Sequence, residues 1–63
     1  MNLAIRIARV KKLLSQAEVA KAAGISQQAY SLIERGLVTP RTKTAKKLEE
    51  VLGIRLGGSS IKG

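Results

Sequence analysis

The sequence predicts an all-α fold, a compact bundle of four or five short helices. Apolar residues make up 44% of the chain, which is enough for one hydrophobic core. Serine, glycine and a single proline divide the chain into segments in which apolar residues recur at helical spacing. The length of 63 residues allows one domain only, expected over residues 1–56 and followed by a flexible Gly/Ser tail over residues 57–63.

The side-chain inventory argues against an enzyme and against a metal site. The chain has no cysteine and no histidine, so it lacks the usual thiol and imidazole groups of catalysis and zinc binding. Its four acidic residues are glutamates, and the adjacent pair Glu49 and Glu50 would diverge on a helix. We therefore expect no catalytic residue, no metal, no cofactor and no small-molecule substrate.

The net charge of +8 favours a polyanionic partner, with nucleic acid first and an anionic membrane surface second. No apolar run approaches the roughly 18 residues that span a bilayer. Basic residues between positions 6 and 12 interrupt any signal-peptide core. We therefore expect a cytoplasmic protein without a membrane partner.

The first two helices are expected over residues 3–13 and 16–23. The first has no glycine or proline and is rich in helix formers. The second begins with Ser15 and Glu18 at the spacing of a capping box, in which each side chain accepts a hydrogen bond from the other residue's backbone N–H. It ends at Gly24, which can adopt the left-handed conformation that closes helices.

The third helix is expected over residues 27–35, with Ser26 as its N-cap and Gly36 at its end. The turn between the second and third helices is then only residues 24–26. Two short helices joined by a turn of three or four residues that contains glycine describe a helix-turn-helix.

The fourth helix is expected to have Pro40 in its first turn, with Thr39 or Thr42 as the cap, and to end at Gly53. Helical spacing predicts its buried face to hold Ala45, Leu48 and Leu52.

The start of the third helix carries two glutamines in the place where a helix-turn-helix contacts DNA. In that motif the second helix enters the major groove, and its N-terminal side chains contact base edges. A glutamine amide can form two hydrogen bonds with adenine, and an exposed leucine can contact a thymine methyl. An ordinary solvated face is the alternative. The outward face is predicted to hold Gln27, Gln28, Ser31, Leu32 and Arg35, and the inward face Ala29, Tyr30 and Ile33.

These segments resemble the lambda-repressor-like (Cro/repressor-type) helix-turn-helix family over residues 5–54. The resemblance implies that the third helix contacts double-stranded DNA. Because helix-turn-helix proteins of this type usually bind two DNA half-sites as a two-fold dimer, a homodimer is also expected. The matching residues are Leu14-Ser15-Gln16-Ala17-Glu18-Val19-Ala20, then Gly24-Ile25-Ser26, then Ile33-Glu34-Arg35-Gly36 and Pro40.

The outward face and the resemblance together imply roles for individual residues. The resemblance implies a partly buried structural ion pair between Arg9 and Glu34. Solvated or unconnected surface groups are the alternative at each of these positions. Base contacts are expected from Gln27, Gln28, Ser31 and Leu32. Contacts to DNA phosphates, which exposed helix starts and cationic side chains both suit, are expected from Gln16, Arg35, Arg41, Thr42 and Lys43.

The sequence departs from the family pattern at three places. Leu13 stands where glycine is usual. Tyr30 stands where isoleucine or valine is usual, and its hydroxyl group needs a partner if it is buried. The usual fifth helix is not evident. Instead, residues 48–62 resemble the end of multiprotein bridging factors, which are transcriptional coactivators with a related helix-turn-helix.

The predicted function is that of a sequence-specific double-stranded DNA-binding transcriptional regulator, a repressor that occupies an operator. A bridging-factor-type interaction domain is one alternative, and the sequence of residues 53–56 favours it. An antitoxin or controller protein of a toxin or restriction system is another alternative, and it would still bind DNA.

A second apolar face is predicted on the first helix, formed by Leu3, Ile7 and Val10 with Leu13 beside them. A second copy of the chain could cover this face, or the chain's own residues 54–61 could fold back over it. The alternative is that these residues face the core. The family pattern places four other residues inward: Ile5, Ala8, Arg9 and Lys12.

Overall fold

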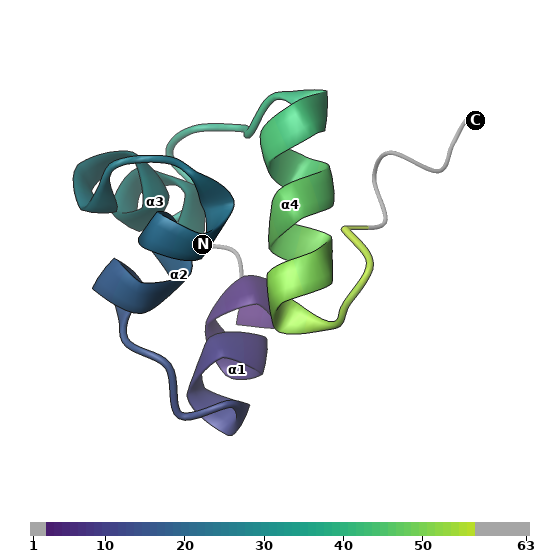
Figure 1. The fold of residues 1–63 in the computed structure, drawn as a ribbon. Coiled ribbons are helices and arrows are strands. Elements are labelled where there is room, and N and C mark those ends of the chain that lie inside the picture. The colour runs from purple at the N-terminus through teal and green to yellow at the C-terminus, as the bar shows by residue number, and fades with distance from the viewer. Residues whose placement is uncertain (1–2, 57–63) are drawn as a thin grey trace.

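The computed structural model describes residues 3–56, which form four helices and their connections (Figure 1). The all-α fold expected from the sequence is confirmed, with the helix-turn-helix in the second and third helices. The Gly/Ser tail expected over residues 57–63 lies outside the described residues. The helices are α1 (Leu3–Lys11), α2 (Gln16–Ala23), α3 (Gln27–Glu34) and α4 (Thr42–Leu52).

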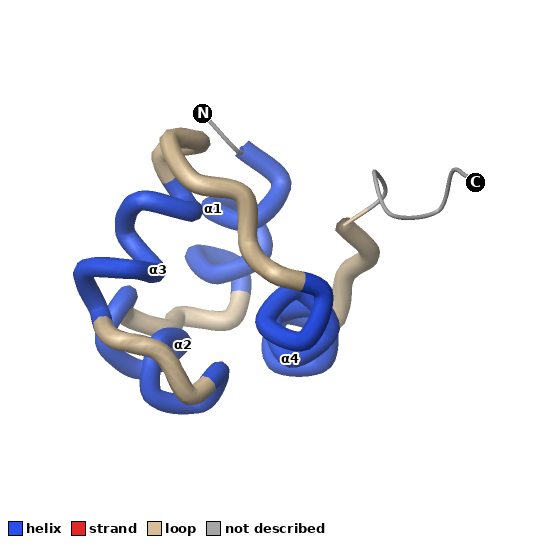
Figure 2. The backbone as a smooth tube through the Cα atoms, turned by 90° about the horizontal axis from the view of Figure 1, so that it is seen from above, coloured by secondary structure: helices blue, strands red, loops and turns tan. Residues whose placement is uncertain are grey.

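The four helices pack around a common centre. α2 packs against both α3 and α4, and α1 packs against the same two helices. In Figure 1, α4 stands upright beside the α2–α3 pair, and α1 lies below. Figure 2 looks almost along α4 and shows the α3–α4 connection passing over the top of the domain. No helix among the described residues is long and apolar enough to cross a membrane.

Local hydrogen bonds fix the boundaries of the helix-turn-helix as the sequence predicts. The Ser15 hydroxyl accepts from the Glu18 N–H at 3.0 Å, and the Glu18 carboxylate accepts from the Ser15 N–H at 2.7 Å. Gly24 closes α2 with a φ of 74°. Ser26 then caps α3, because its hydroxyl accepts from the Ala29 N–H at 3.0 Å. The capping box and both serine caps are therefore confirmed.

The end of α1 differs from the prediction, because the helix stops at Lys11 and not at residue 13. Leu13 adopts a left-handed conformation with a φ of 58°, and its N–H bonds the Val10 carbonyl oxygen at 2.9 Å. The Leu14 N–H reaches back to the Arg9 carbonyl oxygen at 3.1 Å, which completes a Schellman motif. Leucine thus holds a backbone position that suits glycine, the residue usual there in the resembling family.

The start of α4 also differs from the prediction. Pro40 lies before the helix, and neither Thr39 nor Thr42 caps it. The chain is still extended at Arg41, with a ψ of 160°, so the first intrahelical hydrogen bond runs from the Ala45 N–H to the Arg41 carbonyl oxygen at 2.7 Å. An arginine side chain has no acceptor and cannot cap a helix start. The expected first-turn proline and threonine cap are therefore wrong.

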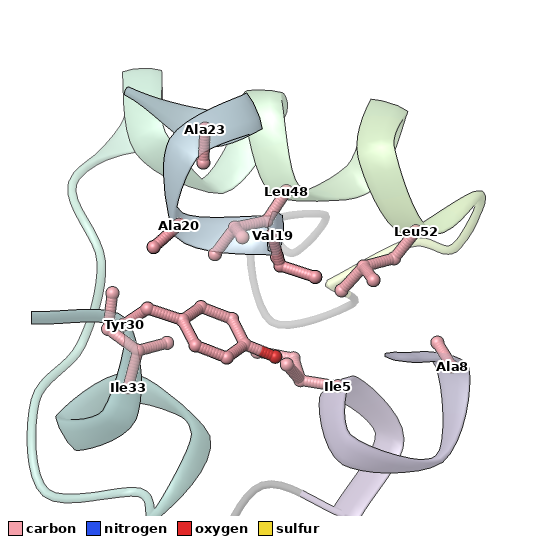
Figure 3. Close-up of a cluster of buried hydrophobic side chains, with 9 residues drawn as sticks. All are labelled: Ile5, Ala8, Val19, Ala20, Ala23, Tyr30, Ile33, Leu48 and Leu52. Atoms are coloured by element: carbon pink, nitrogen blue, oxygen red, sulfur yellow. The ribbon is translucent and has the colours of Figure 1, made fainter. Parts of the chain in front are cut away.

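One hydrophobic core lies between the helices, with the ring of Tyr30 across its centre (Figure 3). Leu48 and Leu52 face it from α4 as predicted, while Ala45 is only half-buried. After α4 ends, Ile54 and Leu56 pack against the same core. The buried apolar residues of this core are Ile5, Ala8, Val19, Ala20, Ala23, Tyr30, Ile33, Leu48 and Leu52.

The orientation of α1 settles which of its two apolar faces is the core face. Ile5 and Ala8 are buried, whereas Leu3, Ile7 and Val10 are exposed. The alternative that the second set faces the core is therefore wrong, because two opposite faces of one helix cannot both meet the same core.

The surroundings of α1 differ from the prediction at Lys12 and in the segment after α4. Lys12, expected to point inward, is exposed, and the end of its side chain lies beside Gly53 at the end of α4. Ile54 and Leu56 pack on the core and leave the outer face of α1 uncovered. Ile61, the other residue expected to fold back, lies outside the described residues.

Candidate nucleic-acid interface

The first turn of α3 presents Gln27 and Gln28 to solvent, directly after the Ser26 cap. This turn contains no acidic residue. The partial positive charge at a helix start favours the approach of an anion. Both amides therefore stand at an end of α3 that tolerates a phosphate backbone nearby, and each can donate and accept hydrogen bonds.

The rest of α3 divides into a buried side and a partly accessible side. Tyr30 and Ile33 are buried as predicted. Ser31 is half-buried, and Arg35, which follows the helix as its C-cap, is exposed. Leu32, expected to be exposed, is half-buried, because partial burial of an apolar side chain is itself favourable. Only the exposed part of the Leu32 side chain is available to contact a base methyl group.

Glu34, at the end of α3, is buried with 5% of its surface exposed and holds together three helices. The predicted ion pair is present: Arg9 Nε lies 2.7 Å from Glu34 Oε1, and Arg9 Nη2 donates to Oε2 at 3.2 Å. The Tyr30 hydroxyl donates to Oε1 at 2.7 Å. The Gln16 amide donates to Oε2 at 3.0 Å. Glu34 thus joins α1, α2 and α3 through one carboxylate.

These contacts determine the charge state of the cluster. Burial alone would raise the pKa of Glu34, but hydrogen bonds from Arg9, Tyr30 and Gln16 and the positive charge of Arg9 outweigh it and hold the pKa at about 2. The hydrogen bond to Glu34 raises the pKa of Arg9. Burial, followed by the hydrogen bond to Glu34, raises the pKa of Tyr30. At neutral pH the cluster therefore contains a charged Glu34–Arg9 pair and a neutral Tyr30.

The sequence does not reveal the roles of two members of the cluster. The sequence predicts that a buried Tyr30 needs a partner for its hydroxyl group but does not name Glu34 as that partner, although the i, i+4 spacing between them is a usable signal. Gln16 was expected to contact DNA, and the structure directs one of its amide N–H groups to Glu34. No pattern in the sequence links positions 16 and 34. One amide N–H and the carbonyl oxygen of the half-buried Gln16 are not used in that contact.

The start of α4 forms a second candidate contact region. Arg41, Thr42 and Lys43 are all exposed. Among the described side chains none caps this helix, and its first turn contains no acidic residue. Its N–H groups therefore remain free to bond a phosphate, and two cations flank them.

Comparisons with known proteins agree with this architecture. A similar curated protein is multiprotein-bridging factor 1c of Arabidopsis thaliana, with 36% identity over 58 residues, or 92% of this chain. The chain spans only 39% of the length of that relative. No solved structure gives a significant match. A family model described as helix-turn-helix matches residues 5–58, nearly the whole chain, so the protein belongs to the Cro/C1-type, lambda-repressor-like helix-turn-helix family of DNA-binding domains.

Proposed function

We propose that the protein is a sequence-specific regulator of transcription, a repressor that contacts the major groove of double-stranded DNA with α3. The observation that carries the proposal is the first turn of α3, in which two exposed glutamines follow a serine cap without a nearby acidic residue. Membership of a DNA-binding family supports the choice of partner. The base contacts are made by Gln27, Gln28, Ser31 and Leu32.

Phosphate contacts position α3 in the groove. Arg35 directly follows α3. At the start of α4, which no described side chain caps, backbone N–H groups lie beside the cations of Arg41 and Lys43. Gln16 keeps amide atoms free for a phosphate while Glu34 holds its side chain in place. Such contacts orient a protein on DNA without distinguishing sequences. The proposed set is Gln16, Arg35, Arg41, Thr42 and Lys43.

Repression follows from occupancy of an operator by a homodimer. Two copies related by a two-fold axis would place their α3 helices in successive major grooves, about 34 Å apart. A DNA partner also implies an intracellular protein, in keeping with the cytoplasmic location expected from the sequence.

A second candidate function rests on the similarity to multiprotein-bridging factor 1c, whose name describes a protein that bridges others. In that case the domain would dock on other proteins and select no operator. A third possibility, an antitoxin or controller protein, shares the DNA-binding step with the main proposal.

The experiment that tests the proposal is selection of bound duplexes from a pool of random DNA by the full chain. The expected result is a palindromic consensus with two half-sites about ten base pairs apart, which would show both operator choice and dimer formation. Recovery of unenriched sequences, with salt-sensitive binding to all DNA, would overturn sequence-specific regulation and favour the bridging function.

A further inference from the structure

α1 presents a second apolar face to solvent. Leu3, Ile7 and Val10 are 56%, 51% and 53% exposed. At 3.6 residues per turn they fall within a sector of about 60° on the helix surface. Ile5 and Ala8 on the other side already meet the core. The outer three residues therefore contribute little to the core, although contiguous apolar patches on small soluble domains usually have a binding role.

Leu13 adds to this face a side chain that the fold does not require, because glycine would suit its left-handed position at the end of α1 better. It lies three residues beyond Val10, in a left-handed conformation with a φ of 58°, and its side chain is 89% exposed. A leucine in this conformation is strained relative to glycine, and an exposed side chain gains almost no packing energy in return. Strain retained without a benefit to the fold points to a use outside it. We call Leu3, Ile7, Val10 and Leu13 together the α1 outer face.

The charges that α1 itself carries beside its outer face have one sign. Arg6 and Lys11, both exposed, lie about 60–80° to either side of its centre line on the helix. α1 contains no acidic residue. Arg9, the remaining cation of the helix, is turned away and paired with Glu34. An apolar stripe with a cation along each edge is the complement of an amphipathic helix with acidic edges.

Other occupants fit this face less well. The segment after α4 is one, but its Ile54 and Leu56 already pack on the core, and one large apolar side chain, Ile61, stands in residues 57–63. A second copy would bring its own Arg6 and Lys11 close to those of the first, and like charges at the edges of an interface disfavour pairing. The face also offers on the order of a few hundred Å², below the roughly 800 Å² per partner typical of a stable dimer.

The DNA backbone and a membrane are the remaining polyanionic surfaces. A phosphate backbone makes no use of four aliphatic side chains. Membrane-surface helices usually add aromatic residues at the interface. The α1 outer face has none, and Tyr30, the single aromatic residue of the chain, is buried in the core.

We propose that the α1 outer face is a docking site for an acidic, amphipathic helix of another protein. Leucine-type side chains of the partner would pack on Ile7 and Val10, while carboxylates on its edges would pair with Arg6 and Lys11. The site lies on a different helix from the proposed base contacts, so it goes beyond DNA binding and does not depend on it. A DNA-bound molecule could then carry a second protein.

The test uses the full chain and a synthetic peptide of about 18 residues, long enough to form a helix. The peptide carries leucines at i, i+3, i+4 and i+7, glutamates along the two edges of this stripe, and alanine and glutamine elsewhere, because glutamate at every other position would oppose helix formation by like-charge repulsion. A control peptide has the same composition in an order that gives no apolar face. Binding is followed by fluorescence anisotropy at about 0.15 M salt, where exposed charges are largely screened beyond about 8 Å. The test variant combines Ile7→Ser with Val10→Ser. The control variant combines Leu37→Ser with Val38→Ser, so it removes exposed apolar side chains that lie outside the α1 outer face.

The expected result is that the amphipathic peptide binds at least about tenfold more tightly than its control, as expected for burial of one or two aliphatic side chains. The variant of Ile7 and Val10 should lose this advantage, and the variant of Leu37 and Val38 should keep it. Circular dichroism establishes that both variants are folded.

Three outcomes would overturn the proposal. Equal binding of both peptides would show attraction by charge alone. Loss of a dimer in sedimentation on changing Ile7 and Val10, without an effect on peptide binding, would assign the face to a second copy. Binding to vesicles of anionic lipid that depends on these residues, with no preference between the peptides, would assign it to a membrane. Operator binding, measured separately, tests the proposed function independently of all three.

Discussion

The hydroxyl group of Tyr30 donates a 2.7 Å hydrogen bond to Oε1 of Glu34, one helical turn further along α3. Both groups are buried, and the carboxylate gives the Tyr30 hydroxyl group the partner that a buried polar group needs. The tyrosine in place of the isoleucine or valine usual in the family therefore has a physical reason here. It supplies a donor to the carboxylate that already binds Arg9 and Gln16.

Replacing Tyr30 by phenylalanine should destabilise the fold by about 1–2 kcal/mol, because a buried carboxylate loses one donor while Arg9 and Gln16 remain. The measurement is urea unfolding. Repeating the substitution in a Glu34→Gln background provides the control, since the coupling between positions 30 and 34 should appear as non-additive free energies. Additive losses would mean that the hydroxyl–carboxylate contact contributes nothing.

Acid should destabilise the protein through Glu34. Its pKa in the folded state is about 2, below the value of 4.5 for a free glutamate, so its contribution is present above about pH 4.5 and is lost as the pH falls towards 2. The loss should reach at most about 3 kcal/mol. Unfolding free energies of the wild type and Glu34→Gln, measured across this range, should converge at low pH. Glu50→Gln, at an exposed position of α4, serves as the control, and an unchanged gap between wild type and Glu34→Gln would remove Glu34 as the cause.

Leu13→Gly should stabilise the protein. Glycine relieves a left-handed strain of about 1–2 kcal/mol, while its greater freedom in the unfolded chain costs about 0.5–1 kcal/mol. The net gain should be roughly 0.5–1 kcal/mol, visible as a rise in Tm of a few degrees. Leu37→Gly is the control: Leu37 is also exposed but does not have a positive φ, so this change should lower Tm. A lower Tm for Leu13→Gly would contradict the strain at this position.

Arg41→Ala and Lys43→Ala should each weaken binding to specific and to unrelated DNA alike. Each change should reduce the slope of log affinity against log salt concentration by about one ion, since one phosphate contact is lost. Lys46→Ala, on an exposed part of α4 that we expect to be solvated, should leave the slope unchanged. Equal slopes for all three variants and the wild type would remove the start of α4 from the DNA contacts.

Features set by neighbouring residues were predictable from the sequence. The capping box of Ser15 and Glu18, the cap at Ser26 and the turn at Gly24 all depend on residues within four positions of one another. The expected end of α4 at Gly53 is also present, and the structure gives this glycine a φ of 69°. Together these signals define the helix-turn-helix and place the two glutamines at the start of α3.

Features set by tertiary packing or by an unfavourable local conformation were not predictable in the same way. Leucine rarely adopts a positive φ, so the residue type at Leu13 does not signal the end of α1, and only the glycine usual there in the family points to it. Pro40 suits a first turn, yet the chain stays extended through Arg41. The pairing of Arg9 with Glu34 came from the family resemblance and not from spacing. The contact from Gln16 to Glu34 exists only because the fold brings α2 beside the end of α3.

Substitutions of Gln27 and Gln28 test whether the start of α3 distinguishes DNA sequences. Affinities of Gln27→Ala and Gln28→Ala are measured on the best duplex from the random pool and on an unrelated duplex of equal length. We predict a loss on the order of 1–3 kcal/mol for each variant on the selected site and a much smaller loss on the unrelated duplex. Equal losses on both duplexes would contradict sequence recognition by α3, because Gln27 and Gln28 would then contribute to affinity for any DNA alike.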